Sequence, residues 1–311
     1  MHATIERYSN LIERILPGKA SFSPFMSYDD KLDVARRVDG VGQIFMQGCR
    51  EALKADTLDG LAACLNAVEV EVRGFAFEGA GMGLALFDHL AHEETNRLQC
   101  FADGSGAAYA SLLYIGAGWT VARLHQPVDE ILAGLHPVLG WLVLDGYGFH
   151  EGFFSPSYRN EQATPKRVPE KARAIFDQGL GRSFWFTYAG DQAQIADTIA
   201  AFPAERRGDL WSGIGLACAY TGIIGRAALQ QLHQHAGEYA SYVAQGMAIA
   251  TMIRHRSGNV APHTELACQV FCSASAEEVA AITDQEYAQL SQTSTEHPYA
   301  TWQQLIRRHF A

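Results

Sequence analysis

The segment 79–87 reads GAGMGLALF and carries two small residues, Gly81 and Gly83, at the centre of an apolar run. A similar small-x-small centre recurs in YIGAGWTVA (114–122), LDGYGFHEG (144–152), DQGLGRSFW (177–185), WSGIGLACA (211–219) and AQGMAIATM (244–252). Counted between Gly81, Gly116, Gly146, Gly179, Gly213 and Gly246, the steps are 35, 30, 33, 34 and 33 residues. A period near 33 residues that is kept over five steps indicates a tandem structural repeat.

Amphipathic runs lie between these centres, with apolar residues three and four positions apart, as in 194–199 and 227–232. Strand-like alternation is nearly absent, and the best candidate, 68–72, merges into a helical pattern. Each unit therefore predicts a helical hairpin with a glycine-bearing first helix and a short second helix. The predicted fold class is all-α. The repeats form either an open solenoid like that of tetratricopeptide (TPR) repeats or a closed α/α toroid, and the sequence does not choose between these two.

The chain holds 29 glycines but only 10 prolines, so the glycine excess is not typical of a loop-rich protein. Glycine inside a helix costs about 0.5–1 kcal/mol relative to alanine, so its repeated use in helices needs a compensating gain. Close approach of neighbouring helices supplies that gain, because only small residues let two backbones come near each other.

The repeats predict five parts along the chain. Residues 1–66 form an N-terminal arm and capping helices, 67–154 repeats one to three, 155–173 a polar loop, 174–273 repeats four to six, and 274–311 C-terminal capping helices. The loop stands where the second helix of the third hairpin should be, because Pro156, Pro165 and Pro169 break the helical pattern. It is either a surface excursion or a lid over a pocket.

The composition is that of an acidic protein with enough apolar residues for a large hydrophobic core: 48% of the residues are hydrophobic, 19% are charged, and the formal net charge is −10. This balance argues against nucleic acid and against anionic membrane surfaces as partners. The uncharged stretch 210–225 is shorter than a membrane span, and the N-terminus lacks the pattern of a signal peptide. We therefore expect a cytoplasmic location, with the six cysteines as buried free thiols.

The densest candidate for catalysis is the segment 141–154, WLVLDGYGFHEGFF. Asp145 lies in an apolar, aromatic run, where desolvation raises a carboxyl pKa and favours a general acid. His150 and Glu151 follow within about a turn and a half and are its candidate partners. Asp177 and Arg182 form a second candidate pair across about one turn. Both candidates have a structural alternative. Asp145 is then a buried carboxylate that is fully hydrogen-bonded, and Asp177 and Arg182 form an ion pair with no catalytic role.

Aromatic residues accompany the glycine-bearing segments. We predict that they line a cavity for an apolar, polyene-like substrate and stabilise positive charge on it through cation–π contacts. The alternative is that they are core packing. The predicted substrate-binding residues are Trp119, Trp141, Tyr147, Phe149, Trp185, Trp211 and Tyr220.

Metal and cofactor signals are weak. Three groups offer ligands at helical spacing, but none matches the spacing of a known closed site. They are His89, His92 and Glu93; His150 and Glu151; and His263, Glu265, Cys268 and Cys272. The chain lacks a phosphate-binding loop and a GxSxG nucleophile motif, and its glycines lie in a helical context rather than after a strand. The sequence predicts no metal and no cofactor.

Several of these phrases together resemble the UnbL-type proteins encoded in enediyne biosynthetic gene clusters, a domain family of unknown function. The phrases are RGFAFEGAGMGLAL, IGAGW, LVLDGYGFHEGFF, FDQGLGRSFWF, DLWSGIGLACAYTG and PHTELAC, which span about residues 73–272. The resemblance implies a bacterial, cytoplasmic role in specialised, polyketide-type metabolism. It brings no assigned mechanism and therefore no catalytic residue.

Two functions follow as hypotheses. The first is a cofactor-independent cyclase or isomerase that binds an apolar substrate in an aromatic cavity and promotes its cyclisation or maturation by acid–base chemistry. The second is a non-catalytic helical-repeat scaffold that binds pathway enzymes, since solenoids commonly present surfaces to other proteins. The clustering of acids with aromatics favours the first hypothesis, and the repeat architecture favours the second.

Overall fold

The computed structural model describes residues 32–91, 96–290 and 297–311. Within these ranges the regular elements are α-helices and short 3-10 turns, and none of them is a strand. The prediction of an all-α fold is confirmed. The strand candidate 68–72 is a turn that leads into the next helix.

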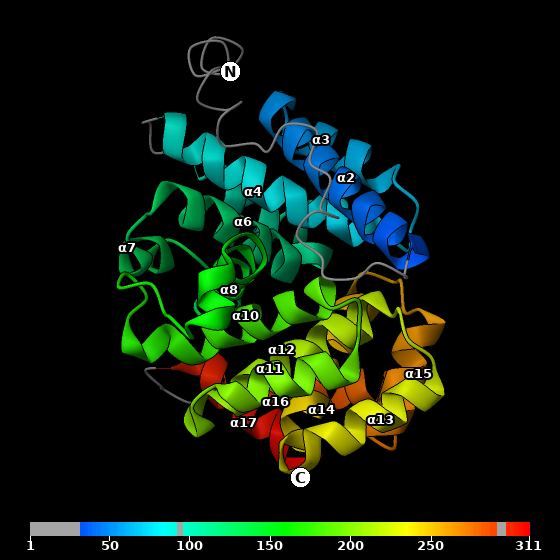
Figure 1. Cartoon of the computed structure of the whole chain (residues 1–311). Coiled ribbons are helices and arrows are strands. Elements are labelled where there is room, and N and C mark those ends of the chain that lie inside the picture. The colour runs from blue at the N-terminus through cyan, green and yellow to red at the C-terminus, as the bar shows by residue number, and fades with distance from the viewer. Residues whose placement is uncertain (1–31, 92–95, 291–296) are drawn as a thin grey trace. The chain divides into compact units, whose positions relative to one another are not determined.

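Each of the six predicted glycine-bearing helices is present and is followed along the chain by a shorter helix, including the third, where the sequence predicted a loop (Figure 1). The pairs are α4 (Arg73–Ala91) with α5 (Arg97–Asp103), α6 (Ala110–Leu124) with α7 (Val128–Ala133), α8 (Leu142–Phe154) with α9 (Pro156–Asn160), α10 (Arg173–Thr187) with α11 (Gln192–Ala201), α12 (Ala204–Thr221) with α13 (Arg226–Ala236), and α14 (Ala240–Arg256) with α15 (Pro262–Phe271). The predicted loop 155–173 is irregular only in part, because it begins with the short helix α9, which has Pro156 in its first turn.

The described residues fall into two compact units, Leu32–Tyr147 and Gly148–Ala311. The first unit begins with α2 (Leu32–Lys54) and α3 (Leu58–Asn66), and the second ends with α16 (Ala276–Leu290) and α17 (Pro298–Arg308). The boundary lies inside α8 and not at the polar loop, where the sequence suggested a division. The third glycine centre is therefore shared, with Gly146 in the first unit and Gly148 in the second.

Glycines let neighbouring helices of each unit touch backbone to backbone. In the first unit, a Cβ at Gly116 would overlap the carbonyl oxygen of Glu78 on α4, and one at Gly81 would overlap that of Leu113 on α6. In the second unit, Gly213 on α12 meets the carbonyl of Gln178 on α10 in the same way. The helical cost of these glycines is therefore offset by close packing of adjacent repeats.

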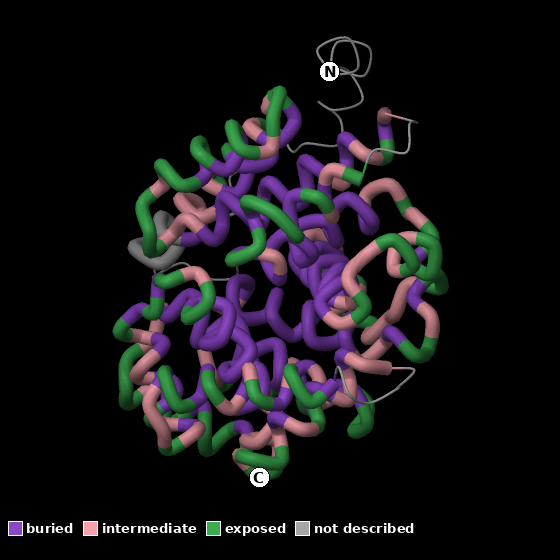
Figure 2. Tube along the Cα trace, turned by 180° about the vertical axis from the view of Figure 1, so that it is seen from behind, coloured by how far each residue is buried: buried purple, intermediate pink, exposed green. Residues whose placement is uncertain are grey.

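The glycine-bearing helices are buried on nearly all sides. Every residue from Ser111 to Ala122 on α6 is buried, whereas α13 buries only Leu229, Leu232 and Ala236. Figure 2 shows the same contrast, with buried residues along the long inner helices and exposed ones on the short helices and connections. Polar side chains on the inner helices therefore lie in a desolvated setting, where their interactions matter most.

Helix α17 does more than cap the last repeat. Its side chains Tyr299, Trp302 and Ile306 are fully buried. Its Gln303 Nε2 donates a hydrogen bond of 2.6 Å to Gln178 Oε1 on α10, so α17 reaches across the inner helices of the second unit. The C-terminal helix pair is present as predicted, but its second member covers α10 and α14.

Candidate functional site

The five predicted catalytic residues are all buried, and they divide between the units. Asp145 lies in the first turn of α8, in the first unit, and is fully buried. His150, Glu151, Asp177 and Arg182 belong to the second unit. Within that unit they separate into two groups, one around His150 and one around Asp177.

His150 and Glu151, near the C-terminal end of α8, form a buried acid–base pair. The imidazole Nδ1 of His150 lies 3.3 Å from the carboxylate Oε1 of Glu151. Each side chain is about 10% exposed. A carboxylate that holds one nitrogen of a histidine fixes the ring orientation and the tautomer. The structure therefore brings together two of the predicted catalytic residues, His150 and Glu151.

Tyr158, on α9, completes this pair and was missed by the sequence analysis. Burial raises the pKa of the Tyr158 hydroxyl, and the negative charge of the nearby Glu151 carboxylate raises it further. The Arg159 guanidinium donates to the Gly152 carbonyl and so holds α9 against the end of α8. The polar loop therefore contributes a side chain to the site. Its position directly after the histidine motif was the signal that could have identified it.

Aromatic side chains of α8 and α10 lie near this pair. The Arg182 guanidinium carbon lies 4.6 Å from the ring centroid of Phe149, a cation–π contact. Phe149 packs edge-on against Phe186 at 5.4 Å between centroids, and the His150 ring lies 5.1 Å from that of Phe154. We name His150, Glu151, Tyr158, Arg182 and Phe149 the His150 cluster. It combines an acid–base pair with an apolar aromatic face.

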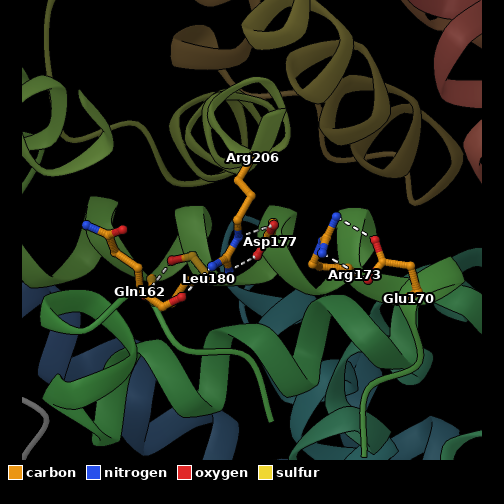
Figure 3. Close-up of polar contacts among 7 residues, drawn as sticks. Gln162, Glu170, Arg173, Asp177, Leu180 and Arg206 are labelled. Carbon is orange, nitrogen blue, oxygen red and sulfur yellow. Dashed lines mark hydrogen bonds and ion pairs between the residues drawn. The ribbon is translucent and has the colours of Figure 1, made fainter. Parts of the chain in front are cut away.

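Asp177 pairs with Arg206 on α12, so the predicted pair between Asp177 and Arg182 is wrong. Arg206 Nε and Nη2 donate to the two carboxylate oxygens of Asp177 at 2.8 and 2.5 Å, as Figure 3 shows. Arg182 has turned toward Phe149, and the facing helix supplies the charge partner. Burial raises the pKa of Asp177, while the hydrogen bonds and charge of Arg206 act against that shift.

Arg206 also ties down the polar loop. Its Nη1 donates to the carbonyl oxygen of Gln162 at 2.5 Å, and the Gln162 side chain donates to the Ala201 carbonyl at 2.6 Å. At the other end of the loop, Arg173 pairs with Glu170 (Figure 3). The loop that carries Tyr158 is thus anchored through a buried ion pair, which makes Asp177 and Arg206 positioning residues rather than members of the His150 cluster.

The predicted substrate-binding aromatics are distributed over both units. Trp119 packs on Phe45 in the first unit, with ring centroids 4.5 Å apart. In the second unit, Trp185 donates to the Thr221 hydroxyl at 3.0 Å, and Tyr220 lies under the guanidinium of Arg254. Trp141 and Tyr147 belong to the first unit, and Trp211 to the second. Among the seven, Phe149 is the one that belongs to the His150 cluster.

The first unit contains a pocket of about 470 Å³ between α4, α5, α6 and α7. Apolar side chains such as Leu98, Val121 and Ile131 line it, with His89 and Glu130 at its polar side. The imidazole Nδ1 of His89 lies 2.8 Å from the side-chain nitrogen of Gln126. No residue predicted as catalytic or substrate-binding lines this pocket.

The predicted metal-ligand groups are engaged in other ways where the structure describes them. His263 Nε2 lies 3.1 Å from the Tyr220 carbonyl oxygen, and the Glu265 carboxylate accepts from the backbone nitrogen of Ala276. In the described ranges no three His, Cys, Asp or Glu side chains form a group that could hold a metal ion. His92 and Glu93 lie outside the described residues.

Asp209, one turn after Arg206, titrates near neutrality. Burial raises its pKa from 3.8 to about 7, and the negative charge of Asp177 adds to the shift. The folded state holds the proton of Asp209 more tightly than the unfolded chain does. The contribution of this carboxyl to the free energy of unfolding is therefore fully present below pH 4 and is lost as pH rises toward 7. We expect Asp209→Asn to exceed the wild type in free energy of unfolding by about 1–2 kcal/mol at pH 8, after allowance for solvent screening at this partly exposed position.

Urea unfolding at pH 5 and pH 8 measures this effect. The exposed residue Asp197, on α11, provides the matched control, because Asp197→Asn should leave the pH dependence of the wild type unchanged. Equal stability of Asp209→Asn and the wild type at pH 8 would contradict the assignment.

Comparison with known proteins identifies the family. No curated protein and no solved structure gives a significant match to the chain. Within the described ranges, no helix combines the length and apolar character that crossing a bilayer requires. The family described as proteins of unknown function (DUF1702) matches residues 19–310, which is nearly the whole chain. The chain therefore belongs to the DUF1702 family.

Proposed function

We propose that this protein is a cofactor-independent enzyme that moves a proton on an apolar small molecule at the His150 cluster, as a cyclase or isomerase does. The observation that supports this proposal is the buried contact between His150 and Glu151, with the ring of Phe154 5.1 Å from that of His150. Histidine is the side chain that enzymes use most often for proton transfer.

Each member of the cluster has a separate task in this proposal. His150 takes or gives the proton through the ring nitrogen that does not face Glu151. Glu151 holds the ring and stabilises the imidazolium that forms, and the Tyr158 hydroxyl connects Glu151 to the partly exposed edge of the loop. Phe149 offers an apolar surface for the substrate, and Arg182 above it can stabilise negative charge that develops on the substrate.

The substrate class follows from the walls of the cluster. Flat or conjugated apolar groups pack well against the faces and edges of phenylalanine rings. A polyene-like substrate of a bacterial, polyketide-type pathway fits this surface. The pathway itself stays a prediction that rests on the resemblance to UnbL-type proteins, and the role of Asp145 as a general acid also stays a prediction.

The scaffold alternative has less support in the second unit. A repeat scaffold presents the surface of its inner helices to a partner. Here Tyr299 and Gln303 of α17 both hydrogen-bond Gln178 on α10, and Arg307 donates to Gln245 on α14 at 2.8 Å. These inner helices are therefore already covered by the chain's own C-terminal helix.

Replacement of His150 tests the proposal. We expect His150→Gln, introduced into the native host, to lower the rate of the step by about 10²–10⁴-fold, because glutamine cannot carry the proton. The readout is the metabolite profile by liquid chromatography and mass spectrometry, in which a precursor should accumulate. Glu151→Gln should have an effect in the same direction, and the accumulated precursor would name the substrate class.

The matched control is His255→Gln, which replaces an exposed histidine near the end of α14. It should leave the profile of the wild type unchanged. If His150→Gln folds with the melting temperature of the wild type and leaves product levels unchanged, the acid–base role is wrong. Product loss only on deletion of the whole gene would then favour the scaffold alternative.

A further inference from the structure

Two of the six cysteines stand together at the end of α15. Cys268 is on the last turn of the helix, and the backbone nitrogen of the C-cap residue Cys272 donates to the Cys268 carbonyl at 2.8 Å. Residues four positions apart in a helix have Cα atoms about 6 Å apart, which is within the range that a disulfide spans.

The two thiols influence each other's protonation. The neighbouring Cys272 thiol lowers the pKa of Cys268, burial opposes this effect, and the Thr251 hydroxyl, 3.1 Å from the Cys268 sulfur, supports it. The neighbouring Cys268 and burial raise the pKa of Cys272. The two thiols therefore titrate as an interacting pair. Cys268 is buried, whereas Cys272 is partly exposed and can meet a reagent.

The other four cysteines lack such a neighbour. Cys49 and Cys218 are fully buried, and burial raises the pKa of Cys49 to about 12 and that of Cys218 further. Cys64 and Cys100 are exposed single thiols, so the prediction that all six thiols are buried is wrong for these two. The pair on α15 is thus set apart by its geometry, with two thiols one helical turn apart.

We propose that Cys268 and Cys272 form a thiol–disulfide exchange site, at which a low-molecular-weight disulfide such as oxidised glutathione closes a reversible bond between the two sulfurs. This site is independent of the His150 cluster and adds a covalent modification to the protein. It uses the two cysteines that the sequence analysis considered as metal ligands.

The exchange runs in two balanced steps. The Cys272 thiol loses its proton to water and attacks one sulfur of the reagent, which forms a mixed disulfide and releases the first thiolate. That thiolate takes the proton from Cys268. The Cys268 sulfur then attacks the Cys272 sulfur and expels the second thiolate, which takes a proton from water. The protein loses two electrons and two protons, and one disulfide becomes two thiols.

The helix end makes this bond easy to reverse. Side chains four residues apart in a regular helix point along the same face but stand farther apart than an unstrained disulfide allows, so the last turn must open slightly. Ser273 directly follows with a left-handed backbone, φ 52°, and α15 has already ended there. A disulfide formed with some strain is reduced more readily than an unstrained one.

Peptide mapping of the full chain tests the site. The protein is incubated with oxidised glutathione, blocked with N-ethylmaleimide and digested with trypsin. Residues 257–307 form one tryptic peptide that contains both cysteines and no other. We expect this peptide to be lighter by two hydrogen atoms and free of maleimide, and to return to two maleimide labels after treatment with dithiothreitol.

Variants separate the two steps. In Cys268→Ser, Cys272 should stop at the glutathione adduct, and in Cys272→Ser, the buried Cys268 should stay unmodified. Cys49 and Cys218 should stay unreacted throughout, which verifies that the protein is folded. If wild-type protein keeps both thiols of peptide 257–307 free, or keeps glutathione on Cys272 beside a free Cys268, the proposal is wrong. These readings of the wild type do not depend on the folding of either variant.

Discussion

Gly48→Ala is expected to cost more than about 3 kcal/mol of unfolding free energy, because the new methyl group has no space and cannot be accommodated by a rotamer change. Gly48 lies on α2, in the first unit, and its Cβ would overlap the carbonyl oxygen of Ala76 on α4. The carbonyl carbon of Ala76 would be 2.7 Å away and its Cα 2.9 Å away. All three atoms belong to the backbone, so relief requires that α2 and α4 move apart.

The same helix offers the matched control. A Cβ at Gly40, two turns earlier on α2, would meet no atom within 4 Å. Gly40→Ala should therefore raise the unfolding free energy by about 0.5–1 kcal/mol through helix propensity alone. Thermal unfolding followed by circular dichroism measures both variants. If the two substitutions shift the melting temperature in the same direction and by the same amount, the backbone contact is not what makes glycine necessary.

The repeat could be predicted from the sequence because the same contact recurs. Each helix pair needs a small residue where two backbones meet, and this need returns once per hairpin, so it leaves a period near 33 residues. The structure places Gly215 on α12 against the carbonyl of Val243, and Gly246 on α14 against that of Ser212. A regular steric requirement is visible in the sequence, whatever closure the repeats adopt.

The partners in the site could not be predicted in the same way. Asp177 and Arg182 have a spacing that suits an ion pair within one helix, but the partner comes from Arg206, 29 residues further along the chain. A charged side chain on a helix can meet several side chains of the helices packed against it. The spacing of residues along one helix does not show which of these becomes its partner. Tyr158 reaches Glu151 because α9 starts directly after α8, a detail of the connection that periodicity does not describe.

The predicted aromatic cavity shows the same limit. Trp119 and Trp185 both follow a glycine centre in the sequence, and they pack in different units on different partners. Position relative to the repeat predicts burial well, because the inner helices are buried on all sides. It does not predict which buried side chains share a site.

Arg206→Met is expected to lower the unfolding free energy of the second unit by about 3–5 kcal/mol, because it leaves the Asp177 carboxylate buried without its charge partner. Asp177 is 1% exposed and receives both its hydrogen bonds of 2.5 and 2.8 Å from this arginine. The substitution also removes the bond to the Gln162 carbonyl, so trypsin should cut faster at Lys166 and Arg167 in the released loop. Urea unfolding and limited proteolysis measure the two effects.

Two further variants assign the cause. Arg256→Met breaks the more exposed pair with Asp284 and should cost less than about 1 kcal/mol. The double variant Arg206→Met/Asp177→Leu should recover most of the lost stability, because it removes the stranded carboxylate and fills the space with apolar atoms. It should not recover resistance to trypsin, because the Gln162 carbonyl still lacks its donor. If the double variant is as unstable as Arg206→Met alone, the cost arises from the lost packing and loop contact of Arg206 and not from the unpaired charge of Asp177.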